Sequence, residues 1–102
     1  MRIYDVRSLV LVVPIDGSLG KSSFGQMRQR QAVIVEIETD DGIVGIGESW
    51  INWPWWGLYE RVATIAHGVR PLLLGKDPCD INGLCQLVHT RLSGIGRQWG
   101  AP

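Results

Sequence analysis

The sequence has neither an excess of one charge nor a long apolar run. Ten basic and ten acidic residues leave a formal net charge of zero, so no overall field favours nucleic acid or an anionic membrane as a partner. The longest apolar run, Leu9 to Pro14, is far shorter than the ~20 residues that span a bilayer. No small-residue cleavage pattern follows it, and we therefore expect a cytoplasmic protein without a signal peptide.

Cysteine and histidine are also scarce, with two residues of each. Cys79 and Cys85 are six positions apart, and no histidine lies at ligand spacing from either. A pair of reduced thiols is therefore favoured over a disulfide or a metal site. Ser22 and Ser23 have no base nearby in the sequence, which argues against a nucleophilic serine. No glycine-rich loop leads from a strand into a helix at phosphate-binding spacing.

The sequence does contain a well-marked β-hairpin. Apolar and polar residues alternate with a period of two over residues 31–39, which is typical of a half-buried strand. Asp41 and Gly42 follow, and this pair predicts a tight type I′ turn, in which both central residues need positive φ. A second antiparallel strand is expected over residues 43–49.

Two features of that second strand bear on packing. Gly45 and Gly47 leave one of its faces without side chains, so we expect another backbone or a helix to pack closely there. Glu48 faces the same way as Val44 and Ile46. A buried, hydrogen-bonded structural role for this carboxylate is favoured over a ligand-facing one.

The rest of the chain predicts one α+β domain. Its 102 residues, 45% of them hydrophobic, are enough for a single core. Residues 3–13 predict a first strand, which completes a three-stranded antiparallel meander followed by helices. Apolar spacings of three and four predict helices over 54–67 and 80–92. Their expected boundaries are an N-cap at Asn52, an end at Gly68, a break at Arg70-Pro71 and a second N-cap at Asp80.

Two segments are candidates for binding a ligand. Residues 15–30 form a long polar loop, and residues 50–56 hold four tryptophans. The first strand leads into the loop and the third leads into the tryptophans, so the two segments can enclose one ligand if those strands are neighbours. The alternative is that the tryptophans close the hydrophobic core. Trp53 and Trp55 are better candidates for a cavity wall than Trp50 and Trp56.

The most distinctive segments are TDDGIVGIGE at residues 39–48 and PLLLGKDPCDI at residues 71–81. Together with the order of strand, long loop, hairpin, aromatic loop and helix, they resemble the N-terminal capping domain of the enolase superfamily, in its mandelate racemase and muconate lactonizing enzyme branch. The resemblance implies a capping domain over residues 1–92. Residues 93–102 then form the start of a connection toward a (β/α) barrel, which this sequence lacks.

In that family, two loops of the capping domain close over the barrel mouth. The barrel binds Mg²⁺ through three acidic ligands and carries the acid/base residues that abstract a proton α to a carboxylate. None of these residues is in this chain, so the chain alone is expected to bind no metal and to catalyse no reaction. The resemblance therefore implies a substrate-capping and specificity domain of a Mg²⁺-dependent acid-sugar dehydratase or racemase.

The implied partners are a small carboxylate or acid sugar, the barrel domain and further copies of the protein in a homo-oligomer. The implied substrate-capping residues are Lys21, Ser22, Ser23, Phe24, Asn52, Trp53 and Trp55. An alternative function is a stand-alone Trp-rich binding or interaction module, because aromatic faces stack on sugar rings and on protein partners.

Overall fold

The computed structural model describes residues 1–14, 21–22, 25–26, 29–51 and 54–94. Its main sheet has three antiparallel strands in the order β1-β4-β5, namely β1 (Ile3–Pro14), β4 (Gln29–Thr39) and β5 (Val44–Ser49). Two short strands form a separate hairpin, β2 (Lys21–Ser22) with β3 (Gly25–Gln26). The predicted three-stranded meander followed by helices is confirmed, with small shifts at the strand ends.

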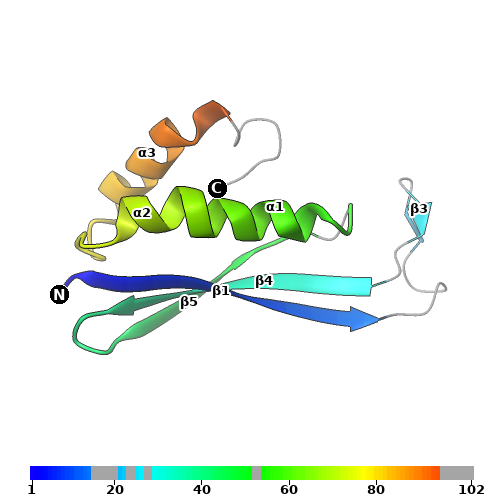
Figure 1. Ribbon diagram of the computed structural model, residues 1–102, viewed down its shortest axis with the longest axis horizontal. Helices are drawn as coiled ribbons and strands as arrows, with labels where there is room; N and C mark the ends of the chain where they lie inside the picture. Colours follow the sequence, from blue (N-terminus) through cyan, green and yellow to red (C-terminus); the bar gives the residue numbers. More distant parts are fainter. Residues whose placement is uncertain (15–20, 23–24, 27–28, 52–53, 95–102) are drawn as a thin grey trace.

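A single helical rod covers one face of this sheet (Figure 1). It consists of α1 (Gly57–Ala63), a wide π-helical stretch η1 (Thr64–Val69) and α2 (Arg70–Leu73). The last helix, α3 (Ile81–Arg91), lies on the side of the rod that faces away from the sheet (Figure 1). The described part of the chain is thus built as a sheet, a rod and an outer helix.

The hydrophobic core lies between the sheet and the helices. Val33 of β4 is fully enclosed, with 0% of its surface exposed. Its neighbours in the core come from β1, the rod and α3: Ile3, Val6, Leu58, Ile65, Leu73 and Val88. The alternating pattern of residues 31–39 thus points its apolar side toward the rod, as a half-buried strand requires.

The first helix differs from its predicted bounds at both ends. It begins at Gly57, after a turn, and its N-cap residue Trp56 makes no side-chain capping bond. Asn52, the predicted N-cap, lies outside the described residues. The predicted end at Gly68 and break at Arg70-Pro71 are wrong, because the chain stays helical to Leu73.

Pro71 and Gly68 have other reasons to occur there. Proline lacks an N–H and crowds the carbonyl four residues earlier, and a widened turn accommodates both effects. Such a turn precedes Pro71, since the Arg70 N–H donates to the Ile65 carbonyl, five residues back. At Gly68, an added Cβ would lie 3.2 Å from a methyl carbon of Leu92, so this glycine lets the end of α3 approach the rod.

The hairpin turn also differs from the prediction. Among the described residues other than glycine, none has positive φ, so Asp41 does not adopt the conformation that a type I′ turn needs. Within this turn only Gly42 has positive φ, at +88°. The Gly42 N–H donates to the Thr39 carbonyl at 3.0 Å and the Thr39 N–H to the Ile43 carbonyl at 2.9 Å. These bonds define a three-residue loop, and a type I turn followed by a left-handed glycine is its usual form.

The start of α3 agrees with the sequence. The Asp80 carboxylate accepts a hydrogen bond of 3.2 Å from the Gly83 N–H, which confirms Asp80 as the N-cap. A side chain at Gly83 would overlap this carboxylate, so glycine leaves room for the cap. Cys79 and Cys85 are both free thiols on the exposed surface.

Candidate functional site

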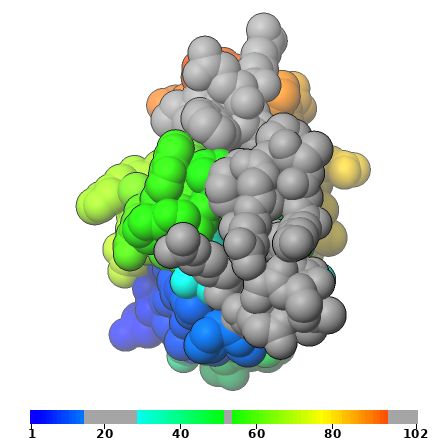
Figure 2. Space-filling view, turned by 90° about the vertical axis from the view of Figure 1, so that its right-hand side faces the viewer, coloured from blue at the N-terminus to red at the C-terminus, as the bar shows by residue number. Residues whose placement is uncertain are grey.

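The two predicted loop segments leave the sheet at the same end. β1 and β5 both pair antiparallel with β4, so they run in the same direction. They are not neighbours, because β4 lies between them, but both run toward the end of the sheet at which β4 begins: β1 ends opposite Gln29 and β5 ends opposite Val33. Figure 2 looks onto this end, where the green start of α1 lies above the blue end of β1.

An apolar groove of about 400 Å³ opens at this end. Trp55 forms one wall and exposes 51% of its surface, while Tyr59, one helical turn later, exposes 62%. Their rings meet edge to face, with 6.1 Å between centroids and 78° between planes, a favoured arrangement for aromatic pairs. The complete lining is Val10, Val12, Gln29, Trp55, Leu58, Tyr59 and Val62. A groove with this lining suits the apolar side of a ligand.

One buried amide connects the groove to the strand beneath it. Gln31 exposes only 5% of its surface, and its Nε2 donates to the Trp55 carbonyl at 3.0 Å. The Gln29 side chain donates in turn to Gln31 Oε1 at 2.9 Å. Buried amide groups need such partners because leaving them unpaired is costly.

The structure places some of the sequence-predicted site residues and not others. Trp55 lines the groove, and Lys21 and Ser22 form β2. Ser23, Phe24, Asn52 and Trp53 lie outside the described residues. The alternative that Trp50 and Trp56 close the core finds no support, since they expose 67% and 49% of their surfaces.

Ile51 fills the core position beneath this segment instead. It is buried, with 7% of its surface exposed, and a Cβ added at Gly57 would lie 2.5 Å from its terminal methyl carbon.

The sequence reading missed Gln29, Gln31 and Tyr59 as site residues. The spacing of four between Trp55 and Tyr59 was the only available signal, because it places two residues on one side of a helix.

A second, larger groove of about 600 Å³ runs between β5 and the rod. Two predictions about β5 are wrong here. No described atom lies within 4 Å of a Cβ added at Gly45 or Gly47, so neither backbone nor helix packs closely on them. Glu48 is exposed rather than buried, because no described element covers the face of β5 on which its side chain lies. The groove is apolar, with Val35, Ile37, Ile65 and Val69 among its lining residues.

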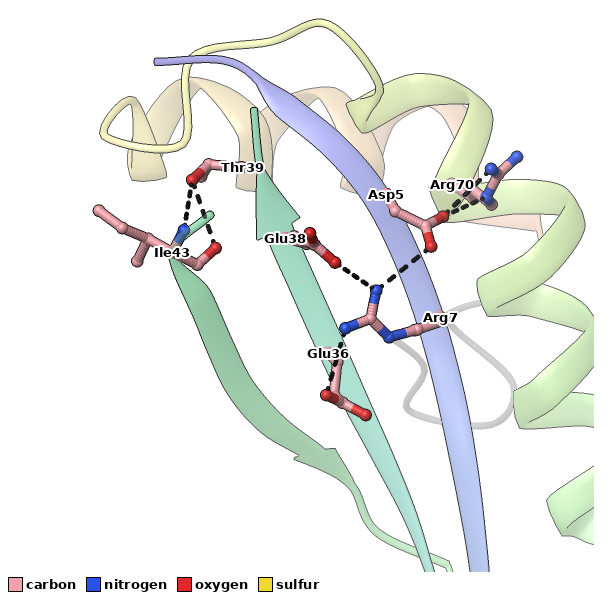
Figure 3. A network of polar contacts seen from close by, with 7 residues as sticks. All are labelled: Asp5, Arg7, Glu36, Glu38, Thr39, Ile43 and Arg70. Carbon is pink, nitrogen blue, oxygen red and sulfur yellow. Dashed lines mark hydrogen bonds and ion pairs between the residues drawn. The ribbon is translucent and has the colours of Figure 1, made fainter. Parts of the chain in front are cut away.

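Three of the described acidic residues, Asp5, Glu36 and Glu38, cluster around Arg7 and Arg70 (Figure 3). Arg7 donates to Glu38 at 2.8 Å, and this bond raises the arginine's pKa above its usual value. Arg70 of the rod donates to Asp5 at 3.1 Å. This bond, helped by Arg7, lowers the pKa of the Asp5 carboxyl. These carboxylates are therefore paired with cations.

The described residues offer no donor set for a resident metal ion. Among them, no three histidine, cysteine, aspartate or glutamate side chains gather closely enough to hold one. In the same residues, no helix is both long enough and apolar enough to cross a membrane.

Comparison with known proteins gives the class and then the family. A racemase from Streptomyces coelicolor A3(2), solved with bound magnesium, superimposes with a TM-score of 0.82 at 28% identity, over 93% of this chain and 26% of its own. The fold is therefore that of an N-terminal domain of enolase-superfamily type. The family model described as mandelate racemase / muconate lactonizing enzyme, N-terminal domain, matches residues 8–97. The chain belongs to this family.

Two curated relatives are enzymes of different reaction types. A chloromuconate cycloisomerase from Cupriavidus pinatubonensis is 35% identical over 71 residues, which cover 66% of this chain and 19% of the relative. A D-galactonate dehydratase from Verminephrobacter eiseniae is 35% identical over 57 residues, which cover 56% of this chain and 14% of the relative. The matched stretch thus covers less than a fifth of the length of either enzyme.

Proposed function

We propose that this chain is the substrate-capping and specificity domain of a Mg²⁺-dependent enzyme that abstracts a proton α to the carboxylate of a small molecule. One observation carries the proposal. In a domain of this family, both candidate loop segments leave the sheet at one end, where Trp55 exposes half of its surface over an apolar groove. An exposed ring beside a groove can desolvate a ligand without being needed for the core.

In this proposal the chain contributes selection and water exclusion. Trp55 and Tyr59 form an apolar wall, and Lys21, Ser22, Ser23, Phe24, Asn52 and Trp53 are the further proposed contacts. The described residues do not fit a metal ion, so the Mg²⁺ ligands and the acid/base residues belong to a partner barrel domain. Closing such a cap over a substrate removes water from the reacting groups.

The proposed reaction is that of an acid-sugar dehydratase or a racemase, and the proposed ligand is a carboxylate or an acid sugar. The galactonate dehydratase and racemase likenesses support this choice. We further propose a cytoplasmic homo-oligomer. The comparisons do not favour the alternative of a stand-alone Trp-rich module.

A matched pair of substitutions in the complete enzyme tests the cap. Trp55 and Trp56 are adjacent and expose 51% and 49% of their surfaces, but only Trp55 lines the groove. Trp55→Ala should lower kcat/KM by about 10- to 100-fold, which corresponds to about 1–3 kcal/mol of lost desolvating contact. It should also change the ranking of a panel of acid sugars, while Mg²⁺ binding stays intact.

Trp56→Ala serves as the control and should alter kcat/KM much less. Circular dichroism and thermal unfolding establish whether each variant keeps its fold. Unchanged kinetics of folded Trp55→Ala across the whole panel would refute the proposed capping role.

A further inference from the structure

The buried amide of Gln31 links two parts of the chain that are 24 residues apart. Its Nε2 donates to the Trp55 carbonyl at 3.0 Å, just before the rod begins. Its Oε1 accepts from Gln29 at 2.9 Å, and Gln29 is the first residue of β4. Gln29 lies near the end of the first loop segment (residues 15–30), where β4 begins, and Trp55 belongs to the second segment. One side chain therefore connects the end of one segment to the other.

Packing alone does not require an amide at this position. Gln31 alternates with Val33 on the side of β4 that faces the rod, and an apolar residue would fill the same space. An amide buried there is tolerated because its nitrogen donates to the Trp55 carbonyl and its oxygen accepts from Gln29. The donor is satisfied by a backbone carbonyl of the tryptophan segment, so burying this amide favours one placement of that segment.

The backbone around Trp55 forms a turn that this bond can hold. The Gly57 N–H donates to the Pro54 carbonyl at 2.9 Å, which closes the turn directly before α1. The Gln31 bond meets the carbonyl of Trp55 inside this turn. The indole ring is held separately by its edge contact with Tyr59. Gln31 thus fixes the backbone of Trp55, and Tyr59 fixes the ring.

We infer that Gln31 is a positioning residue that holds Trp55 in the groove wall and, through Gln29, couples the two loop segments. Its consequence for substrate selection rests on the proposed function of the domain. The coupling itself is a property of this chain and can be measured without any substrate.

The chemistry of the amide suggests three variants. Gln31→Met keeps a similar shape but can neither donate nor accept in this arrangement. Gln31→Glu keeps an acceptor for Gln29, but an ionised carboxylate cannot donate to the Trp55 carbonyl. Gln29→Ala removes the upstream donor together with one polar residue of the groove lining, from a half-buried position where the fold should tolerate the change.

Amide hydrogen exchange at Gly57, measured on the intact protein, reports opening of the turn. Loss of one buried hydrogen bond should speed this exchange about tenfold in Gln31→Met and Gln31→Glu. Gln29→Ala should speed it by a smaller factor. Gln86→Met, at an exposed glutamine of α3, and Thr39→Val, at a buried polar residue at the other end of β4, should leave it unchanged.

The controls separate positioning from general stability. Thr39→Val weakens the hairpin, so equal acceleration at Gly57 in this variant would overturn the local role of Gln31. Unchanged exchange at Gly57 in folded Gln31→Met, or in Gln31→Glu at a pH where its carboxylate is ionised, would overturn it too. Unchanged exchange in Gln29→Ala would overturn the coupling between the segments.

Kinetics of the complete enzyme distinguish this inference from the proposed function. If both hold, Gln31→Met raises KM for the substrates whose ranking Trp55→Ala alters. Faster exchange at Gly57 in Gln31→Met, with unchanged kinetics of both Gln31→Met and Trp55→Ala, would refute the capping function and leave the positioning role intact. Unchanged exchange at Gly57 in Gln31→Met, together with a lowered kcat/KM of Trp55→Ala, would refute the positioning role and leave the capping function intact.

Discussion

Three glycines of one hairpin should respond in opposite directions to replacement by alanine. Gly42 has φ of +88°, a left-handed conformation in which a Cβ costs roughly 1–2 kcal/mol. Alanine also restricts the unfolded chain, which offsets roughly 0.4–1 kcal/mol of that cost. No described atom lies within 4 Å of the added Cβ. We therefore expect Gly42→Ala to lower the free energy of unfolding by about 1 kcal/mol.

Gly45 and Gly47 lack both the positive φ and the close neighbours. Only Gly42 and Gly75 have positive φ among the described glycines, and the space beside Gly45 and Gly47 is open. Glycine inside a strand is roughly 0.5–1 kcal/mol less favourable than alanine. Each of these two substitutions should therefore raise the free energy of unfolding by roughly that amount.

Urea denaturation followed by circular dichroism measures all three variants, and thermal unfolding provides a second reading. For a domain of this size, 1 kcal/mol shifts Tm by roughly 4–8 °C. Unchanged m values would show that the variants alter stability and not the extent of unfolding. If Gly45→Ala or Gly47→Ala loses as much stability as Gly42→Ala, an element packs on β5, as the sequence predicts. The conclusion that the space beside Gly45 and Gly47 is open would then be wrong.

Two further predictions concern charge and capping. The pKa of Asp5 is lowered in the folded state, first by Arg70, so the unfolded carboxyl, with a pKa of about 3.9, binds its proton more tightly. Asp5 thus stabilises the fold above this pH and loses that effect as pH falls through its folded pKa. Asp5→Asn should lower Tm at neutral pH and flatten its fall in acid; an unchanged acid slope would contradict this. Asp80→Ala should cost about 0.5–2 kcal/mol of stability through loss of the α3 cap. Gly83→Ala should gain less than the ~1 kcal/mol of helix propensity, because its Cβ displaces the Asp80 carboxylate. The full gain should return in an Asp80→Ala background, and a double-mutant cycle of unfolding free energies tests this.

The candidate site was only partly predictable from the sequence. Four tryptophans in a connecting segment marked Trp55 as a binding candidate, and the meander brought both loop segments to one end. The roles of Gln29 and Gln31 were not visible, because glutamine has no positional signature in a strand. Their hydrogen bonds depend on where the turn before α1 lies over β4, which is a long-range property.

Sequence by itself determined the elements whose causes are local. Alternation over residues 31–39 specified a strand with one buried face. Asp80 specified the start of α3, because its carboxylate accepts a hydrogen bond from Gly83, only three positions later in the sequence. The α+β class follows from these elements, because a sheet with one apolar face must be covered by something. The resemblance in the hairpin and in residues 71–81 then indicated the family.

Tertiary structure decided what the glycines and Pro71 mean. Gly68 followed by Pro71 has the local form of a helix end, yet the rod continues, because a π turn accommodates the proline and Leu92 packs where a Cβ would have been. Gly45 and Gly47 have the local form of a close-packing site, yet the described structure leaves them beside an open groove. A missing side chain permits close approach without requiring it. Which neighbour arrives is set by contacts between residues far apart in the chain.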